Sequence, residues 1–496
     1  MTRPFVGNII SCGAYVPRLR LPREQIAAAM QWHGSTSAAA ASGSRAICNW
    51  DEDALTLAVQ AARECLKNAG GYADVAAKVG SVSLASTTLP FADRSNSTLL
   101  AAALDLPTTV QTADFSGSLR AGTSALAEAA VQANATAGPR LVVAADARQT
   151  KPGSSQELEY GAGAAAILVT GTNATVPGSL PTLATVLSSA HLAADFVDHY
   201  RLSGDQFDYA LEERWVRDEG LSKQIPATIA KALQAAEVAP SAIDTLVIAG
   251  GASAAKRIAR LAGLEHVKFQ DNLRADCGDT GTAHPLLMLA AALDAASAGQ
   301  HILAIGFGQG VDALVVRVSA TKPNASGRNV GAALARRKTE PHYTRYLSHS
   351  GLLDVDFGMR AERDNRSAHS VAWRKHREVT AFVGGRCETC GTVQFPKNRV
   401  CVNPECRSTD TQAEHRLAEA TGRVKSFTED WQAYSPRPPA VYGNVEFEGG
   451  GNLLMELSDV DAGEVSVGMR VSFAFRIKDV DPLRSFKRYF WKAVQV

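Results

Sequence analysis

One stretch of the chain, Cys277 to Pro285 (CGDTGTAHP), combines small residues with two groups that can transfer protons. Glycine lets a backbone come close to a ligand, and proline suits the first turn of a helix. The pattern predicts a tight loop running into a buried helix, with Asp279 and His284 at its mouth. A histidine can act as general acid or base near neutral pH, and Asp279 could orient it or serve as the base. The alternative is a strand-to-helix turn with one satisfied histidine.

A second reactive group is formed by four cysteines that lie close together in the sequence: Cys387, Cys390, Cys401 and Cys406. The C-x-x-C and C-x4-C pairs form two short hooks, which can place four thiolates tetrahedrally around zinc. Because four sulfurs leave no open coordination position, we expect a structural zinc ion. The alternative is four unrelated buried cysteines. The other four cysteines are scattered, as reduced thiols of a cytosolic chain usually are.

Bulk properties narrow the class of protein. The chain has 496 residues, 46% of them hydrophobic, which is enough for two to four domains with a large core. A formal net charge of +1 argues against a nucleic-acid or anionic-membrane partner. No apolar run reaches the ~18 residues of a membrane span, and the first ten residues lack the apolar region of a signal peptide. We therefore expect a cytoplasmic protein.

The elements that must position these residues alternate between strands and helices, which predicts an α/β fold with buried sheets. We expect strands at 6–15, 79–86, 108–115, 140–146 and 243–250, a hairpin at 301–318, and helices at 51–70, 123–134, 226–236 and 286–298. Asp51 is the expected cap of the helix at 51–70. The second half repeats the order of the first, which suggests an internal duplication.

The composition changes towards the C-terminus. Residues 319–340 are polar and rich in Gly, Ser and Arg, as in a linker, and residues 341–380 predict an extended arm. Beyond the four cysteines, five short alternating strands with glycine turns predict an OB-type barrel. These strands lack a basic, aromatic stacking face, so we do not expect this barrel to bind nucleic acid.

Several stretches resemble the hydroxymethylglutaryl-CoA-synthase-like branch of the thiolase superfamily: IISCGAYVPRLRL, DFSGSLRAGTSAL and ADARQTKPGSSQELEYGAGAAAILV. From about residue 341, YTRYL, GRCETCGTVQFP and RYFWKA resemble the zinc-ribbon/OB domain that accompanies thiolase-like enzymes. The resemblance implies a duplicated, five-layered α/β fold that is normally dimeric. The implied domains are two thiolase-like halves (1–175 and 176–320), a linker and arm (321–380), a zinc ribbon (381–410) and an OB domain (411–496).

The resemblance also shows where this chain departs from the branch. Leu119 stands at the position of the nucleophilic cysteine, Thr87 at that of the glutamate and Ala249 at that of the histidine. By contrast, His284-Pro285-Leu286 resembles the G-H-P-L run of thiolases. The resemblance therefore implies an enzyme that acts on acyl-CoA or acyl-carrier thioesters but cannot use the family's cysteine.

We expect aldol or retro-aldol chemistry without an acyl-enzyme, with His284, Asp279, His199 and Ser118 as catalytic candidates. His199 belongs to a DHYR run that resembles the branch's D-F-W-R. Coenzyme A enters as part of the substrate, and the Lys256-Arg257 pair could meet its phosphates.

Two other classes of function stay open. One is an acyltransferase or Claisen condensing enzyme, with Ser118 or Cys277 as nucleophile. The other is a non-catalytic partner of an active homologue. We expect a homodimer or a larger assembly, with neither a nucleic-acid nor a membrane partner.

Overall fold

The computed structural model describes residues 7–34, 40–135, 138–171, 182–210, 212–319, 329–360, 368–481 and 483–496. The chain divides into two compact units. Unit 1 comprises Met1–Cys48, Asp53–Ala101 and Leu106–Tyr343, and unit 2 comprises Asn49–Glu52, Ala102–Asp105 and Thr344–Val496. No helix among the described residues is long and apolar enough to cross a membrane.

A ten-stranded sheet forms the frame of unit 1, in the order β12-β11-β13-β14-β8-β1-β7-β6-β4-β5. Its strands are β1 (Gly7–Tyr15), β4 (Ser81–Ala85), β5 (Gln111–Phe115), β6 (Arg140–Ala147), β7 (Ala162–Gly171), β8 (Ala184–Ala193), β11 (Thr245–Ile248), β12 (Lys268–Phe269), β13 (His301–Phe307) and β14 (Gly310–Val318). Strands β6, β7, β11 and most of β14 are buried, as near-continuous apolar runs predict.

The two halves of this sheet have the same topology. In the first half β4 is parallel to β5 and β6, while β7 is antiparallel to β6 and β1. In the second half β11 is parallel to β12 and β13, while β14 is antiparallel to β13 and β8. Counted within its half, each set of five strands has the order 3-2-4-5-1. The duplicated fold expected from the sequence is therefore confirmed.

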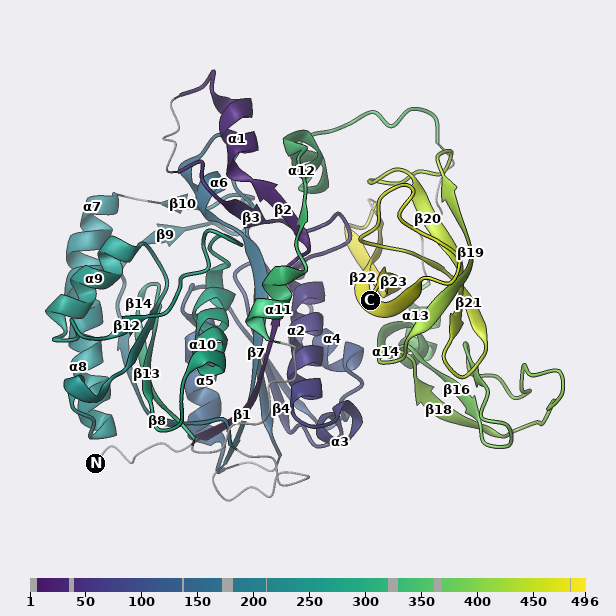
Figure 1. Cartoon of the computed structure of the whole chain (residues 1–496), viewed down its shortest axis with the longest axis horizontal. Helices are drawn as coiled ribbons and strands as arrows, with labels where there is room; N and C mark the ends of the chain where they lie inside the picture. Colours follow the sequence, from purple (N-terminus) through teal and green to yellow (C-terminus); the bar gives the residue numbers. More distant parts are fainter. Residues whose placement is uncertain are drawn as a thin grey trace. The chain divides into compact units, whose positions relative to one another are not determined.

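Helices complete five layers, which Figure 1 shows side by side in unit 1. The central layer holds α5 (Ala121–Gln132) and α10 (His284–Ala295). One outer layer contains α2 (Ala54–Asn68), α3 (Tyr72–Ala76) and α4 (Asn96–Ala103), and the other contains α8 (Ile225–Ala236) and α9 (Ala252–Leu261). Each central helix follows the third strand of its half, so the duplication includes the helices.

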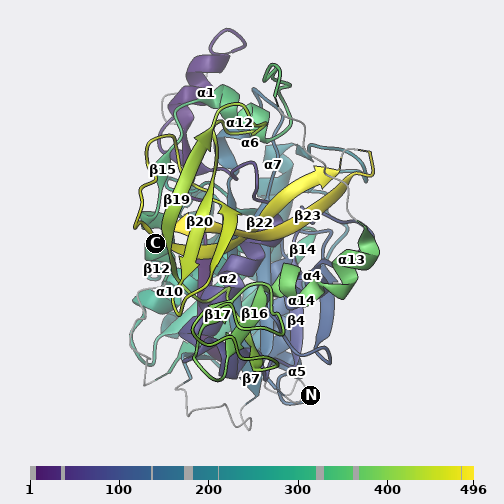
Figure 2. The same ribbon diagram turned by 90° about the vertical axis from the view of Figure 1, so that its right-hand side faces the viewer.

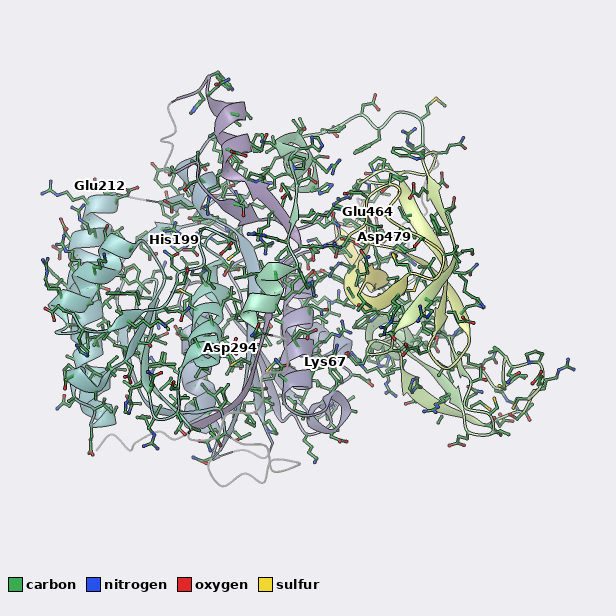
Figure 3. All side chains as sticks on the ribbon, in the orientation of Figure 1. Lys67, His199, Glu212, Asp294, Glu464 and Asp479 are labelled. Carbon is green, nitrogen blue, oxygen red and sulfur yellow. The ribbon has the colours of Figure 1, made fainter. Side chains whose placement is uncertain are left out.

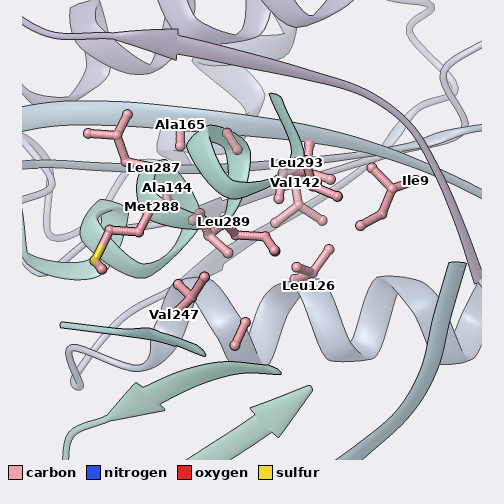
Figure 4. Close-up of a cluster of buried hydrophobic side chains, with 14 of the residues drawn as sticks. Ile9, Leu126, Val142, Ala144, Ala165, Val247, Leu287, Met288, Leu289 and Leu293 are labelled. Atoms are coloured by element: carbon pink, nitrogen blue, oxygen red, sulfur yellow. The ribbon is translucent and has the colours of Figure 1, made fainter. Parts of the chain in front are cut away.

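The central helices are buried because they are apolar on nearly every side. Leu287, Leu289 and Leu293 of α10 are fully buried and pack in one cluster with Leu126 of α5 (Figure 4). The two elements approach so closely that a Cβ on Gly122 would lie 2.5 Å from the Thr282 carbonyl oxygen. A glycine is therefore needed where α5 meets the loop before α10.

The prediction that Asp51 caps the second helix is wrong. Helix α2 begins at Ala54, and its cap is Asp53, whose carboxylate accepts a hydrogen bond from the Thr56 N–H at 3.1 Å. The Thr56 hydroxyl in turn accepts the Asp53 N–H at 2.8 Å. This capping box satisfies two backbone N–H groups at the start of the helix. Asp51 is too far from the first turn to accept a hydrogen bond from them.

Shorter elements complete unit 1. They are β2 (Leu19–Pro22), β3 (Ser44–Ala46), β15 (Lys338–Thr339), the β9–β10 hairpin (His199–Tyr200 and Tyr209–Ala210), α1 (Arg23–Met30), α6 (Ser155–Glu159), α7 (Glu213–Trp215), α11 (Val330–Ala335), a π-helix (Val216–Gln224) and two 3-10 turns (Pro240–Ala242 and Gly281–Ala283). Strands β15, β2 and β3 form a separate small sheet.

Unit 2 contains a three-stranded ribbon sheet and a five-stranded sheet, several of whose strands are labelled in Figure 2. The ribbon strands are β16 (Val383–Cys387), β17 (Val393–Gln394) and β18 (Gln412–Arg416); the larger sheet has β19 (Gly422–Asp430), β20 (Ala440–Phe447), β21 (Asn452–Glu456), β22 (Arg470–Asp481) and β23 (Phe486–Gln495). Its order, β21-β20-β19-β22-β23, is consistent with the expected OB fold.

The extended arm expected at 341–380 contains short helices instead, among the residues that are described. They are α12 (Tyr343–His349), α13 (His369–Arg374) and α14 (His376–Ala381). The weak periodicity of this stretch reflects helices of only six or seven residues, which are too short to show an apolar stripe.

A buried charge cluster joins separate segments within unit 2. The Arg476 guanidinium, 1% exposed, lies 3.1 Å from a Glu52 carboxylate oxygen and 3.0 Å from one of Asp459. The Lys492 ammonium, 3% exposed, lies 3.1 Å from an oxygen of Asp51. The segment Asn49–Glu52 thus supplies carboxylates to cations that the last two strands carry.

Candidate functional site

The three positions at which the sequence resemblance predicts a departure from the branch follow the carboxyl ends of strands. Thr87 follows β4, Leu119 lies between β5 and the first turn of α5, and Ala249 follows β11. In open α/β sheets, ligands bind beyond the carboxyl ends of the strands. The loops that follow these strands therefore form the candidate site.

Ser118 joins the start of α5 to a loop from the other half of unit 1. Its hydroxyl donates to the Gly308 carbonyl at 2.6 Å, and the Arg120 Nε donates to the same oxygen at 3.2 Å. A Cβ on Gly308 would lie 2.9 Å from the Ser118 Oγ, and Gly308 has a φ of 156°. The loop at 308–310 can therefore sit against the α5 N-terminus only with glycine at this position.

The same loop holds a histidine–aspartate pair. The Gln309 N–H donates to Asp198 Oδ1 at 3.0 Å, and the His199 Nδ1 lies 2.7 Å from Asp198 Oδ2. His199, labelled in Figure 3, has a side chain that is 16% exposed. No hydrogen bond joins its Nε2 to any residue that the structure describes. Because Nδ1–H donates to the carboxylate, Nε2 carries the free lone pair, which is the tautomer of a general base.

The hairpin that begins with His199 is tied to the loop after β4. The Arg201 guanidinium donates to the Thr87 carbonyl at 2.6 Å. Further along the hairpin, Asp208 lies 2.5 Å from Arg148 and accepts the Tyr160 hydroxyl at 3.0 Å. These contacts bring His199, Ser118 and the backbone of Thr87 into one region of unit 1.

Asp146 is a residue of this region that the sequence reasoning missed. It is fully buried at the end of β6 and accepts hydrogen bonds from the N–H and hydroxyl of both Thr87 and Thr282 and from the hydroxyls of Ser86 and Thr88. The only signal in the sequence is a single aspartate ending an apolar strand. The Asp146 carboxylate therefore holds the loop after β4 and the loop before α10 together.

His284 lies deeper than the sequence suggests. It is fully buried, its Nε2 lies 2.8 Å from the Asn272 carbonyl and its Nδ1 accepts the Thr280 N–H at 3.2 Å. Burial lowers the pKa of His284, although Asp279 opposes the shift. Both ring nitrogens of His284 are thus engaged within the protein.

Asp279 is half-buried beside cations. Burial works to raise the pKa of its carboxyl, but His284, Arg148 and Arg274 outweigh this effect and the pKa is lowered. Its Oδ1 accepts the Gly281 N–H at 2.9 Å. No hydrogen bond or ion pair described for Asp279 or His284 reaches His199 or Ser118.

No hydrogen bond or ion pair described for the remaining sequence candidates reaches His199 or Ser118. Lys256 and Arg257 are exposed on α9, where Arg257 lies 3.5 Å from Asp218. The Cys277 thiol is fully buried and donates to the Leu273 carbonyl at 3.2 Å, and burial raises its pKa to about 12. A thiol with that pKa is a poor nucleophile near neutral pH.

The four ribbon cysteines come together as their spacing predicts. All four sulfurs lie within 4.8 Å of one another, with Cys387 and Cys406 3.9 Å apart and Cys390 and Cys401 3.6 Å apart. Thiolates that each lie about 2.3 Å from one zinc ion are roughly 3.8 Å from each other. The sulfur positions therefore fit a closed, tetrahedral zinc site.

Comparisons with known proteins give separate matches for the zinc-ribbon and OB region and for a larger part of the chain. Residues 375–412 match the model of the ChsH2 rubredoxin-like zinc ribbon domain, and residues 415–476 match the ChsH2 C-terminal OB-fold domain. The hydroxymethylglutaryl-CoA synthase of Thermoplasma volcanium is 26% identical over 314 residues, which cover 62% of this chain and 85% of that protein.

Solved structures show the fold of the N-terminal region. The 3-oxoacyl-(acyl carrier protein) synthase III FabH of Pseudomonas aeruginosa has a TM-score of 0.55 at 21% identity, over 64% of this chain and 100% of that one. MvaS in complex with 3-hydroxy-3-methylglutaryl coenzyme A has a TM-score of 0.55 at 19% identity, over 73% and 94%. This chain joins a thiolase-like fold to a ChsH2-type zinc ribbon and OB fold. The thiolase-like fold is unit 1, with the His199 region at the ends of its strands.

Proposed function

We propose that the thiolase-like unit forms or breaks a carbon–carbon bond of an acyl-CoA thioester by an aldol or retro-aldol step, without a covalent acyl-enzyme. The hydroxymethylglutaryl-CoA synthase relatives support the substrate class. Leu119 supports the absence of an acyl-enzyme, because an alkyl side chain cannot form a thioester. The observation that carries the proposal is His199, which Asp198 orients while its Nε2 stays free.

In the cleavage direction, the His199 Nε2 takes the proton of the substrate's β-hydroxyl group. The Cα–Cβ bond then breaks, its electrons pass into the thioester to form an enolate, and the β-carbon becomes a carbonyl. The protonated His199 returns the proton to Cα, so that no other reactant is needed. Asp198 stabilises the imidazolium that exists between the two transfers.

The enolate oxygen requires positive charge nearby, because stabilisation of developing charge is usually the largest catalytic contribution. The N-terminus of α5 carries the partial positive charge of the helix dipole. Arg120, at the cap of α5, adds a guanidinium whose side chain is 20% exposed and which also pairs with Asp312 at 3.0 Å. We assign the thioester carbonyl to this end of α5.

The nucleophiles of the condensing-enzyme alternative have little support. Cys277 is buried with a raised pKa. The Ser118 hydroxyl donates to a carbonyl oxygen instead of a base, so nothing described here would remove its proton.

For His284 and Asp279, a catalytic role stays a prediction. Their contacts support a role in positioning the loop before α10. Lys256 and Arg257 likewise remain the predicted contacts for coenzyme A phosphates. If they bind these phosphates, their joint replacement by alanine should raise KM for acetyl-CoA and leave kcat unchanged.

The test uses two probes with the full-length protein. Exchange of the acetyl-CoA methyl protons in D₂O reports enolate formation, and cleavage of 3-hydroxy-3-methylglutaryl-CoA reports the complete step. His199→Ala should lower both rates by ~10²–10⁴-fold, the usual effect of losing a general base. Leu119→Ala and the exposed His33→Ala serve as controls and should leave both rates near wild type.

Three results would contradict the proposal. If His199→Ala exchanged the acetyl-CoA methyl protons at the wild-type rate and His284→Ala did not, His284 would be the base instead of His199. An acyl adduct that peptide mass spectrometry of the active protein locates on Ser118 or Cys277 would support the condensing enzyme. Activity that appears only after a homologue is added would support the non-catalytic partner.

A further inference from the structure

A second set of polar side chains lies on strands β8 and β14, outside the His199 pair. The Ser189 Oγ is 3.1 Å from the His191 Nε2, and the His191 Nδ1 is 2.8 Å from Asp312 Oδ1. The serine therefore contacts one ring nitrogen and the aspartate contacts the other. This is the order of contacts in a serine–histidine–aspartate triad.

Strand geometry produces this line of three residues. Ser189 and His191 are two positions apart on β8, so their side chains point to the same face. Asp312 of β14 is the direct cross-strand neighbour of His191. The pairing register also skips Leu187, so a β-bulge lies immediately before Ser188 and Ser189. Bulges of this kind re-aim side chains and occur often beside active sites.

Asp312 is fixed as the buried member of the set. It is fully buried, and its Oδ2 accepts hydroxyls of Thr123 at 2.9 Å and Ser124 at 2.6 Å, while Arg120 donates to its Oδ1 at 3.0 Å. Burial works to raise the pKa of this carboxyl, but the hydrogen bonds from His191 and Ser124 and the charge of Arg120 outweigh it and lower the pKa. An ionised, immobile carboxylate selects the His191 tautomer with a proton on Nδ1.

The other two members are accessible to a reactant. The His191 side chain is 48% exposed and Ser189 is half-buried. With Nδ1 protonated, Nε2 is the acceptor for the Ser189 hydroxyl proton.

We propose that Ser189 is a nucleophile for acyl groups, activated by His191 and Asp312, which gives the protein an esterase or thioesterase activity separate from the His199 chemistry. The Ser189 Oγ forms a bond to the acyl carbon as its proton passes to the His191 Nε2. The ester or thioester bond then breaks, and the leaving alkoxide or thiolate takes that proton. Water, deprotonated by His191, releases the acid and restores Ser189.

The experiment labels the full-length protein with a fluorophosphonate probe and locates the adduct by peptide mass spectrometry. We expect one adduct on Ser189, none in Ser189→Ala, and labelling slowed by ~10²–10⁴-fold in His191→Ala. Hydrolysis of 4-nitrophenyl acetate should fall in parallel. Ser188→Ala is the matched control: its hydroxyl donates to the Ala232 carbonyl on the opposite face, so labelling should persist.

The His199→Ala variant separates this proposal from the aldol mechanism, because it should be labelled at the wild-type rate. The proposal fails if folded wild-type protein gives no adduct or gives it on another serine. It also fails if His191→Ala is labelled as fast as wild type.

Discussion

Replacing Asp146 tests how the two loops of the candidate region are held. This buried carboxylate accepts six hydrogen bonds of 2.8–3.1 Å from the loop after β4 and the loop before α10. In Asp146→Ala the four hydroxyl donors can rotate towards other acceptors. The backbone N–H groups of Thr87 and Thr282 cannot, and each buried donor left without a partner costs about 1–3 kcal/mol.

Two orphaned backbone donors therefore give a loss of about 2–6 kcal/mol in the free energy of unfolding of unit 1. Asp146→Asn should lose less, because one amide oxygen remains and the threonine hydroxyls can accept from the new NH₂ group. Thr87→Val is the graded control: it removes one hydroxyl bond and should cost about 1 kcal/mol.

The assay is urea unfolding followed by circular dichroism at 222 nm, since the long helices lie in unit 1. Because the chain has two units, midpoints and slopes are compared between variants. The reasoning is refuted if Asp146→Ala shifts the midpoint no further than Thr87→Val does. Such a result would mean that the two loops hold their shape without the carboxylate.

Three further predictions concern the metal, pH and assembly. Elemental analysis should find about one zinc per chain and a loss in Cys387→Ser, and chelation should unfold the zinc ribbon first; full zinc occupancy in Cys387→Ser/Cys401→Ser would contradict the assignment. Because burial lowers the pKa of His284, the folded state binds fewer protons there than the unfolded state. Stability should therefore fall as pH drops through about 6.5. In His284→Gln, the urea midpoint should no longer depend on pH in this way between pH 5 and 7. The homodimer stays a prediction, which a monomer in sedimentation at micromolar concentration would contradict.

The sequence predicted the elements whose signal is local and long. Apolar runs marked β6, β14 and α10, and helical periodicity marked α2, because burial of whole strands and helices leaves a pattern over many residues. The zinc ligands were equally predictable from the sequence, since two short hooks fix the ligand spacing without information on the tertiary structure.

The candidate site was harder to predict because contacts between distant segments create it. Strands β9 and β10 have two residues each, too few for any periodicity, yet this hairpin carries His199. Asp312 and His191 are 121 residues apart and meet only through the register of β14 against β8. His284 showed the opposite problem: a family-like motif suggested an accessible base, whereas the fold uses both ring nitrogens internally.

The charge cluster of unit 2 limits how this protein can be dissected. Arg476 and Lys492 belong to the C-terminal sheet, but Asp51 and Glu52, which neutralise them, come from a segment near the start of the chain. Removing one partner of a buried ion pair costs about 3–5 kcal/mol. A tail expressed from residue 344 onward would keep the cations and lose these two carboxylates. The zinc-ribbon and OB region is therefore not an interchangeable module, and a transplant to another enzyme would have to bring residues 49–52 with it.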